Sequence, residues 1–95
     1  MDQSNSPKLE RIAEVRHAEG LHMRPAMQFV DCASGYESVI EVHKDQQCVD
    51  GKSIMQMTML AATAGTQLRI TAQGPDADEA LEALARVLEC PESVA

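Results

Sequence analysis

The spacing of apolar residues constrains the fold of this 95-residue chain more than any other feature. In some segments apolar residues recur every three or four positions, as on one face of a helix, and in others they alternate with polar residues, as in a half-buried strand. A chain with both patterns is expected to pack helices against a sheet around one core. The two helical stripes consist of Ala26, Phe29, Val30 and Ala33, and of Leu81, Leu84, Ala85 and Leu88.

The first half of the chain predicts a strand, a helix and a pair of strands. Residues 1–8 are polar and predict a flexible N-terminal tail, after which Leu9–His17 is predicted as a strand. A loop leads to a helix predicted over Met23–Ser34, which a glycine follows. Tyr36–His43 alternates and predicts a half-buried strand, and residues 47–49 predict a short return strand after a polar turn.

The next segment predicts a second helix and a further strand. Ser53 and Gln56 fit a capping box, in which a hydroxyl and a side chain three residues later satisfy each other's backbone amides. A helix is therefore predicted from residue 54 to about residue 62. Residues 66–73 then alternate between apolar and polar types, which predicts a strand with its apolar face toward the core.

The last segment predicts a third helix, and it completes the order β-α-β-β-α-β-α. Asp76 and Glu79 fit a second capping box before the C-terminal stripe. Pro91 ends this helix, and residues 91–95 are predicted as a C-terminal tail. The strands alternate rather than being apolar on both faces, so the sheet should be exposed on one side and covered by helices on the other. We therefore predict one α+β domain of two layers over residues 9–90.

Composition and charge exclude several classes of partner. Apolar residues make up 44% of the chain but aromatic residues only 2%, so the core should be aliphatic and rich in methionine. With few aromatic rings and a formal net charge of −7, the chain is a poor candidate for binding nucleic acid. No apolar run approaches the roughly 20 residues that span a bilayer. We expect a protein or small-molecule partner and no membrane insertion.

The three cysteines, Cys32, Cys48 and Cys90, form no CxxC pair. The polar N-terminal segment has no secretory signal pattern, so free thiols in a reducing cytoplasm are the simplest expectation. Histidines and cysteines supply possible metal ligands, but no pair has the short spacing of a zinc site, so no metal site is predicted. Nothing near Cys32 or Cys48 favours a reactive thiolate. The methionines within residues 55–59 are expected to fill the core rather than to bind a soft metal.

The stretch GLHMRPA, residues 20–26, places a histidine at the start of the first predicted helix. Pro25 suits the first turn, because its missing N–H would have no helical partner there. Unpaired amides at a helix start and the forked guanidinium of Arg24 both suit phosphate oxygens. A neutral imidazole at His22 can attack phosphorus, and the same positive groups would stabilise the phosphorylated ring. From residue types alone, an exposed loop histidine without a special function remains the commoner situation.

Two motifs resemble the signatures of the histidine-containing phosphocarrier protein (HPr) family of the bacterial phosphoenolpyruvate-dependent phosphotransferase system. GLHMRPA is similar to the family's active-site GLHARPA, and DGKSIMQMTMLAA is similar to the GKSIM run that opens its second helix. EALEALARVLE resembles its last helix, and the similarity extends over Leu9–Glu89. The resemblance implies the family's open-faced β-sandwich, a four-stranded antiparallel sheet with three helices on one face.

In this family a histidine takes a phosphoryl group from Enzyme I and passes it to a IIA protein or domain. The resemblance therefore implies that His22 is the phosphoryl acceptor, on its Nδ1 (pros) nitrogen. It also implies that Arg24 stabilises the bound phosphoryl group. A member of this family is a monomeric carrier rather than an enzyme, and it needs no cofactor.

Ser53 has a second implied role. In many relatives the serine at this position is phosphorylated by HPr kinase/phosphorylase, and a phosphate is electrostatically well placed at a helix start. Capping alone also explains a serine there. One alternative therefore stays open, a regulatory HPr-like module that acts mainly through phosphorylated Ser53 and protein binding, with His22 little used.

Several positions depart from the family pattern. Glu19 and Met23 replace small residues beside the histidine, and the carboxylate of Glu19 would repel a phosphate. Asp31 and Ser34 stand where the first helix often carries lysines, and Gln56 stands where a basic residue is frequent. The predicted docking surface is less positive than in many relatives. We therefore expect a specialised partner, in a regulatory rather than a sugar-importing branch.

Overall fold

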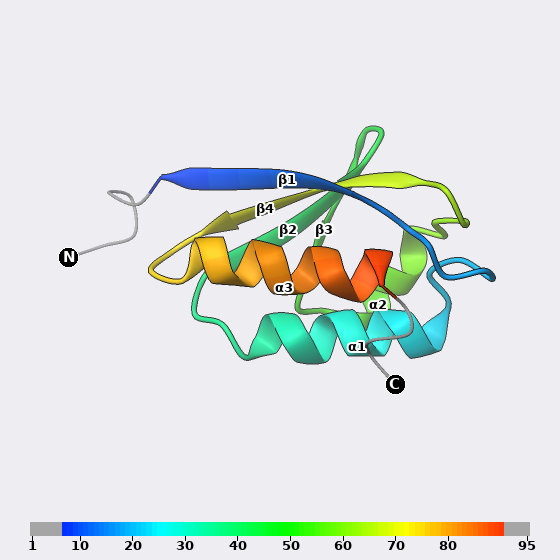
Figure 1. Cartoon of the computed structure of the whole chain (residues 1–95), viewed down its shortest axis with the longest axis horizontal. Helices are drawn as coiled ribbons and strands as arrows, with labels where there is room; N and C mark the ends of the chain where they lie inside the picture. Colours follow the sequence, from blue (N-terminus) through cyan, green and yellow to red (C-terminus); the bar gives the residue numbers. More distant parts are fainter. Residues whose placement is uncertain (1–6, 91–95) are drawn as a thin grey trace.

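A computed structural model describes residues 7–90, and residues 1–6 and 91–95 of the predicted tails lie outside the described residues. The end of the N-terminal tail predicted over residues 1–8 is wrong, because Lys8 already pairs with Gln73 in the sheet. The first strand also ends at Glu14 rather than at His17, because the chain leaves the sheet and Arg16 donates its amide to the Leu88 carbonyl of the last helix. The structure has two layers, a sheet and three helices that cover one face of it (Figure 1). Its elements are β1 (Lys8–Glu14), α1 (Met23–Ser34), β2 (Val39–Lys44), β3 (Gln47–Asp50), α2 (Ile54–Met59), β4 (Gln67–Gln73) and α3 (Ala77–Glu89). The predicted α+β class, the element order and the two-layer arrangement are confirmed.

The four strands of the described region form one sheet in the order β1-β4-β2-β3, with every neighbouring pair antiparallel. The central strand β4 pairs Ile70 with Arg11 of β1 and with Val42 of β2. Because side chains alternate between the faces of a strand, Leu68 and Ile70 point into the helical layer and are fully buried. The opposite face of the sheet has no helix over it in the described structure (Figure 1).

The core lies between the sheet and the apolar stripes of α1 and α3. Phe29 of α1 and Leu84 of α3 are both fully buried, and each such side chain contributes about 1.5–3 kcal/mol through removal from water. Both stripes face the sheet as the helical spacing predicts, with Val30 the one member that is only partly buried. The start of α1 is thereby held in a fixed position relative to the sheet.

The predicted start of β2 is wrong because of a contact from α3. The strand begins at Val39 rather than at Tyr36, and Glu37 and Ser38 instead donate their backbone N–H groups to the Asp76 carboxylate, at 2.9 and 3.0 Å. The Ser38 hydroxyl donates to the same carboxylate. Asp76 precedes α3 as predicted, but its side chain makes no capping bond to that helix, so the second capping box is also wrong.

Helix α2 is shorter than predicted. It ends at Met59 rather than near residue 62, and Ala61 adopts a left-handed φ of 52° that a helix cannot continue through. The Lys44 ammonium donates to the Leu60 carbonyl at 2.9 Å and so satisfies one of the unpaired carbonyls at this end. This early stop lets the chain turn back toward the loop before α1.

The first predicted capping box is half confirmed. The Ser53 hydroxyl accepts the Gln56 amide at 3.3 Å, as expected for a helix N-cap. The Gln56 side chain does not return to Ser53, and its Oε1 accepts the Asp50 amide at 2.9 Å instead. Gln56 therefore fastens the end of β3 to the start of α2.

The methionines of α2 differ from the expectation that they fill the core. Met57 is fully buried, but Met55 and Met59 are 74% and 67% exposed. Residues 55 and 59 lie four positions apart, so they share the outer face of the helix.

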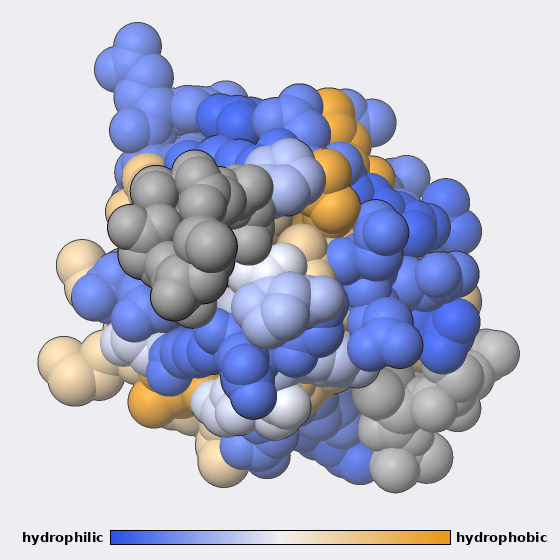
Figure 2. All heavy atoms as spheres, turned by 90° about the vertical axis from the view of Figure 1, so that its left-hand side faces the viewer, coloured by the Kyte–Doolittle hydropathy of each residue, from blue (hydrophilic) through white to orange (hydrophobic). Residues whose placement is uncertain are grey.

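The surface at one end of the molecule is mainly hydrophilic, with a few separate hydrophobic areas (Figure 2). No helix within residues 7–90 is long and apolar enough to cross a membrane.

Candidate functional site

The loop before α1 is fastened to the segment that follows α2. Gly20 has a φ of 84°, and a Cβ at this position would lie 2.7 Å from the Ala62 carbonyl oxygen. The next residue, Leu21, is buried and donates its amide to that carbonyl at 2.8 Å. Only glycine allows both this backbone conformation and this close approach. Together these contacts fix where the chain enters α1.

His22 is the residue immediately before α1 and holds the N-cap position. Its backbone is extended, with φ −81° and ψ −170°, and its carbonyl accepts the Ala26 amide at 3.0 Å. The imidazole makes no capping bond, and its side chain is 47% exposed. The ring is therefore free to meet a partner molecule at the positive end of the helix.

The first turn of α1 offers donors to an anion beside His22. Within residues 7–90, the amides of Met23 and Arg24 have no hydrogen-bond partner, and Pro25 has no N–H to offer. No acidic residue lies in this turn. In the same part of the chain the exposed guanidinium of Arg24 makes no ion pair or hydrogen bond. Two unpaired amides and a free guanidinium are hydrogen-bond donors of the kind that bind phosphate oxygens.

Among residues 7–90, Glu19 is the one carboxylate that lies beside the ring. Its Oε1 lies 3.8 Å from Nε2 of His22, and its side chain is 85% exposed. The separation is longer than a hydrogen bond, so the carboxylate acts on the ring through its charge alone. The same negative charge opposes an incoming phosphate, as the sequence suggests.

A shallow depression of about 400 Å³ lies beside the ring, between the histidine loop and the end of α2. Its lining is mostly small or apolar apart from His22 and Glu19, and Thr58 and Thr63 contribute hydroxyl-bearing side chains. It opens to solvent and contains no further charged group. Its shape suits the side chain of a docking protein better than an enclosed small molecule.

Ser53 stands at the other end of α2 from this depression. The helix has six residues, which is about 9 Å at 1.5 Å per residue. Ser53 is half-buried, and its neighbour Lys52 donates its ammonium to the Tyr36 carbonyl at 2.7 Å. A charge added at Ser53 would therefore alter the same outer surface that α2 presents near His22.

The outer surfaces of α1 and α2 carry methionines rather than lysines. Met23 and Met27 are 56% and 48% exposed on α1, in addition to Met55 and Met59 on α2. The departures Asp31, Ser34 and Gln56 are all exposed on these helices. Apart from Arg24, the outer surfaces of these two helices carry no basic side chain and are rich in flexible apolar ones.

The remaining histidines and cysteines have other surroundings. His17 donates from Nε2 to the Val87 carbonyl at 2.8 Å, so it fastens the loop to α3. Burial raises the pKa of the Cys32 thiol, which disfavours a reactive thiolate.

His43, Cys48 and Glu41 lie together on the open sheet face. The sequence analysis missed this grouping, because it searched only for metal ligands close together in the sequence. A two-residue turn between two short strands places His43 directly opposite Cys48, and this hairpin register was the sequence signal that could have revealed the grouping.

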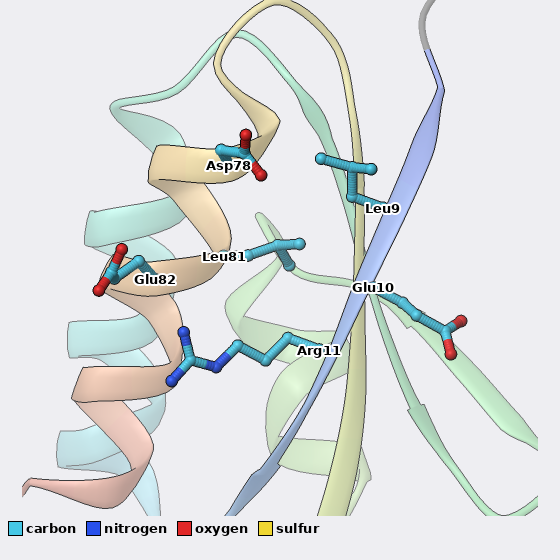
Figure 3. A pocket seen from close by; sticks show the side chains of 6 residues that line it. All are labelled: Leu9, Glu10, Arg11, Asp78, Leu81 and Glu82. Atoms are coloured by element: carbon cyan, nitrogen blue, oxygen red, sulfur yellow. The ribbon is translucent and has the colours of Figure 1, made fainter.

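A second depression, of about 520 Å³, lies between β1 and α3 (Figure 3). Leu9 and Leu81 point into it, and the Arg11 side chain extends toward Glu82 across its opening. It contains both charge signs and no nucleophile, and it lies apart from the histidine loop. Its residues provide no chemistry comparable to that of His22.

Comparison with known proteins agrees with this geometry. A family model described as "PTS HPr component phosphorylation site" matches residues 9–89. Phosphocarrier protein HPr of Pseudomonas aeruginosa is 46% identical over 70 residues, which are 73% of this chain and 78% of that protein. HPr-like protein Crh of Bacillus subtilis is 41% identical over 81 residues, or 85% of this chain and 95% of that protein. A crystal structure of a phosphocarrier protein HPr from Bacillus anthracis superposes with a TM-score of 0.83 at 39% identity, covering 86% and 98% of the two chains.

The open-faced sheet with an exposed histidine at a helix start defines a protein that carries a group rather than one that encloses a substrate. The chain belongs to the HPr family of phosphocarrier proteins of the phosphotransferase system, and it is a carrier rather than a catalytic enzyme. The resemblance carried by GLHMRPA and DGKSIM is thereby confirmed.

Proposed function

We propose that His22 carries a phosphoryl group, which it accepts from Enzyme I and passes to a IIA protein or domain. The observation that carries this proposal is the half-exposed imidazole at the start of the 12-residue helix α1, beside two unpaired amides and the free guanidinium of Arg24. The working unit is the domain of residues 9–90, acting as a monomer in the cytoplasm without a cofactor.

In the transfer step, the lone pair on Nδ1 of His22 attacks the phosphorus atom of the phosphorylated donor. The bond between phosphorus and the donor atom breaks, and its electron pair returns to the donor. The closest approach of the Glu19 carboxylate is to Nε2, so its negative charge is nearer to that nitrogen than to the one that attacks. The amides of Met23 and Arg24 and the guanidinium then stabilise the dianionic product. The shallow site leaves that product accessible to the next partner.

The test is phosphorylation by Enzyme I with phosphoenolpyruvate. We expect an adduct that acid destroys, as phosphohistidine requires, and we expect none in His22→Ala. His43→Ala is the matched control and should be phosphorylated as fast as wild type, since its ring lies on the open sheet face. Arg24→Gln should accept the group more slowly. An adduct that persists in His22→Ala would contradict the proposal.

A second candidate function is regulation through phosphorylated Ser53, and its position favours this possibility. Ser53 is the N-cap of α2, where a phosphate is stabilised by the helix start. HPr-like protein Crh is also among the similar proteins. Incubation with ATP and HPr kinase/phosphorylase should give an acid-stable adduct on wild type and none on Ser53→Ala. If this adduct forms and the acid-labile adduct does not, the regulatory module is the correct description.

The methionine-rich outer surfaces of α1 and α2, whose one cation is Arg24, support a specialised partner in a regulatory branch. Asp31, Ser34 and Gln56 stand where basic residues would pair with an acidic partner surface, so Arg24 alone offers a cation there. We expect slow transfer with an Enzyme I and IIA pair taken from a sugar-transport system. Transfer as fast as that of the HPr native to that system would contradict specialisation.

A further inference from the structure

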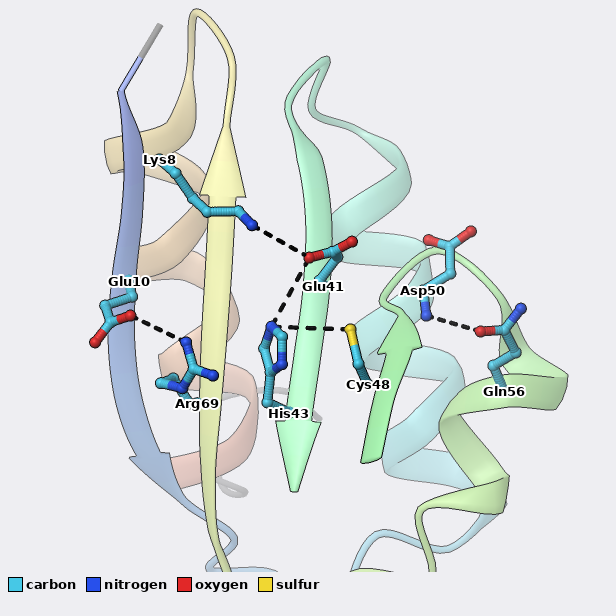
Figure 4. Close-up of polar contacts among 8 residues, drawn as sticks. All are labelled: Lys8, Glu10, Glu41, His43, Cys48, Asp50, Gln56 and Arg69. Atoms are coloured by element: carbon cyan, nitrogen blue, oxygen red, sulfur yellow. Dashed lines mark hydrogen bonds and ion pairs between the residues drawn. The ribbon is translucent and has the colours of Figure 1, made fainter. Parts of the chain in front are cut away.

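Three side chains with metal-ligating atoms meet on the open face of the sheet. The tight turn at Asp45 and Gln46 joins β2 to β3, and it sets Cys48 directly opposite His43. Glu41 precedes His43 by two residues on the same strand, so its side chain points to the same face. Figure 4 shows the three side chains converging on the outer side of the hairpin.

The ligating atoms of this group are already close. Nε2 of His43 lies 3.8 Å from Oε1 of Glu41 and 3.9 Å from Sγ of Cys48, and all three atoms lie within 4.8 Å of one another. Tetrahedral zinc, with bonds of about 2.0–2.3 Å, separates its ligand atoms by about 3.4–3.6 Å. Small side-chain rotations would close the difference. The His43 side chain is only 18% exposed, which limits its freedom before binding.

We propose that Glu41, His43 and Cys48 bind a divalent cation of the Zn²⁺ class. Nitrogen, sulfur and oxygen donors together suit a borderline-soft ion, whereas Mg²⁺ and Ca²⁺ require oxygen donors alone. Three protein ligands leave a fourth position for water. On binding, the Cys48 thiol loses its proton to solvent and the thiolate bonds to the metal, so no oxidant or reductant is needed.

The charges around the group permit a cation. Lys8 is the nearest competitor, with its Nζ 3.6 Å from Oε1 of Glu41, but its side chain is 55% exposed and can turn into water. Arg69 stands beside His43 in the register of β4, and its guanidinium is engaged by Glu10 at 3.1 Å. The chain's net charge of −7 also favours cation binding.

Binding would join β2 to the edge strand β3 without touching the phosphorylation site. The group lies on the sheet face opposite the helices, whereas His22 precedes α1 in the helical layer (Figure 1). A metal that binds only the folded chain stabilises it in proportion to the logarithm of its concentration over its Kd. We therefore expect Zn²⁺ to raise the midpoint of thermal unfolding.

The test is titration of the full chain with Zn²⁺ and with Co²⁺ under thiol-free reducing conditions. We expect one ion per chain by calorimetry, and a thiolate-to-cobalt charge-transfer band with the strong visible bands of a four-coordinate ion. Cys48→Ser and His43→Gln should each weaken Zn²⁺ binding by more than the about 10–100-fold that loss of an outer-shell partner costs. Because Cys48 is exposed, Cys48→Ser should keep the fold, which circular dichroism would verify.

Cys90→Ser is the matched control, since it removes another exposed thiol. It should leave affinity, stoichiometry and the cobalt spectrum unchanged. The proposal is overturned if Zn²⁺ does not bind, if Cys48→Ser binds it as tightly as wild type, or if one ion binds per two chains. It is also overturned if the cobalt complex shows no thiolate band.

Discussion

At the scale of single residues, the histidine loop depends on a backbone contact that leaves no room for a side chain. Gly20 combines a left-handed φ with a carbonyl oxygen 2.7 Å from its potential Cβ. We predict that Gly20→Ala destabilises the fold, because overpacking adds about 1–3 kcal/mol to the strain of the backbone conformation. It should also slow phosphorylation of His22 by displacing the Leu21 amide from the Ala62 carbonyl. Urea unfolding and the rate of transfer from Enzyme I measure the two effects.

Gly65→Ala separates backbone strain from crowding. Gly65 has a similar φ of 90°, but the nearest atom to its potential Cβ is 4.0 Å away. This variant should lose only the about 1–2 kcal/mol that the left-handed conformation costs, and it should transfer phosphate at the wild-type rate. Equal losses of stability and rate in the two variants would show that the contact with Ala62 does not position the loop.

A second prediction at this scale concerns the carboxylate beside the imidazole. Replacing Glu19 with glutamine should raise the ratio of phosphorylated to unphosphorylated protein, at equilibrium with phosphorylated Enzyme I, by about 2–5-fold. The reason is that the negative charge of Glu19 repels the phosphoryl dianion, and such repulsion between exposed charges costs on the order of 1 kcal/mol at moderate salt. Mass spectrometry of the intact protein measures the ratio, and the effect should shrink as salt is added. Glu82→Gln, exposed on α3, is the control and should change nothing.

At the scale of elements, Asp76 joins the start of α3 to the segment before β2. Hydrogen bonds from the Ser38 hydroxyl and the Glu37 amide hold the pKa of the Asp76 carboxyl below its usual range. A carboxyl with a lowered folded pKa stabilises the fold above its unfolded pKa of about 4, and this contribution is lost as the pH falls through the folded value. We predict that Asp76→Asn lowers the free energy of unfolding by about 1–2 kcal/mol at pH 7, as expected for hydrogen bonds to a half-exposed charged acceptor. Urea unfolding at pH 7 and at pH 3 should show the difference from wild type shrinking at the lower pH.

Asp78→Asn provides the comparison for that experiment. Asp78 lies two positions further along α3, in its first turn, and it is exposed. Its replacement should cost less than that of Asp76, because the helix dipole contributes only about 0.3–1 kcal/mol at an exposed site. A loss for Asp76→Asn that is as large at pH 3 as at pH 7 would show that the carboxylate charge is not what stabilises this junction.

The bounds of a helix or strand can be predicted when neighbouring residues set them, and cannot be predicted when contacts with distant residues set them. The bounds of α1 were predictable, since a stripe of apolar residues, Pro25 in its first turn and Gly35 after its end are all local signals. The start of β2 was not, because it is set by Asp76, which lies 38 positions beyond Ser38. The end of α2 likewise depends on Lys44, 16 positions earlier than Leu60. Such contacts exist only after the sheet has formed.

The same distinction applies to the site. His22 and Arg24 are two residues apart, so one helix start places both, and their juxtaposition follows from the motif alone. The contact of Leu21 with Ala62 and the exposure of Met59 depend on how α2 ends, which the apolar pattern does not reveal. The methionine spacing was interpreted as core filling, but the same spacing is equally compatible with the exposed face of a short helix.

At the scale of the whole molecule, the two layers present different exposed apolar residues, and only one layer contains His22. Met55 and Met59 are exposed on α2, whereas Ile12 and Val39 are 56% and 52% exposed on β1 and β2. We predict that Met55→Gln with Met59→Gln lowers kcat/KM for phosphoryl transfer from Enzyme I about tenfold, which corresponds to about 1.4 kcal/mol of lost contact. The fold should change in stability by no more than about 0.5 kcal/mol, because both side chains are already in water. Ile12→Thr with Val39→Thr removes comparable apolar surface from the strands and should leave transfer unchanged. Stopped-flow assays measure the rate of transfer from Enzyme I to each double variant. Equal rates for the two double variants would mean that α2 takes no part in docking.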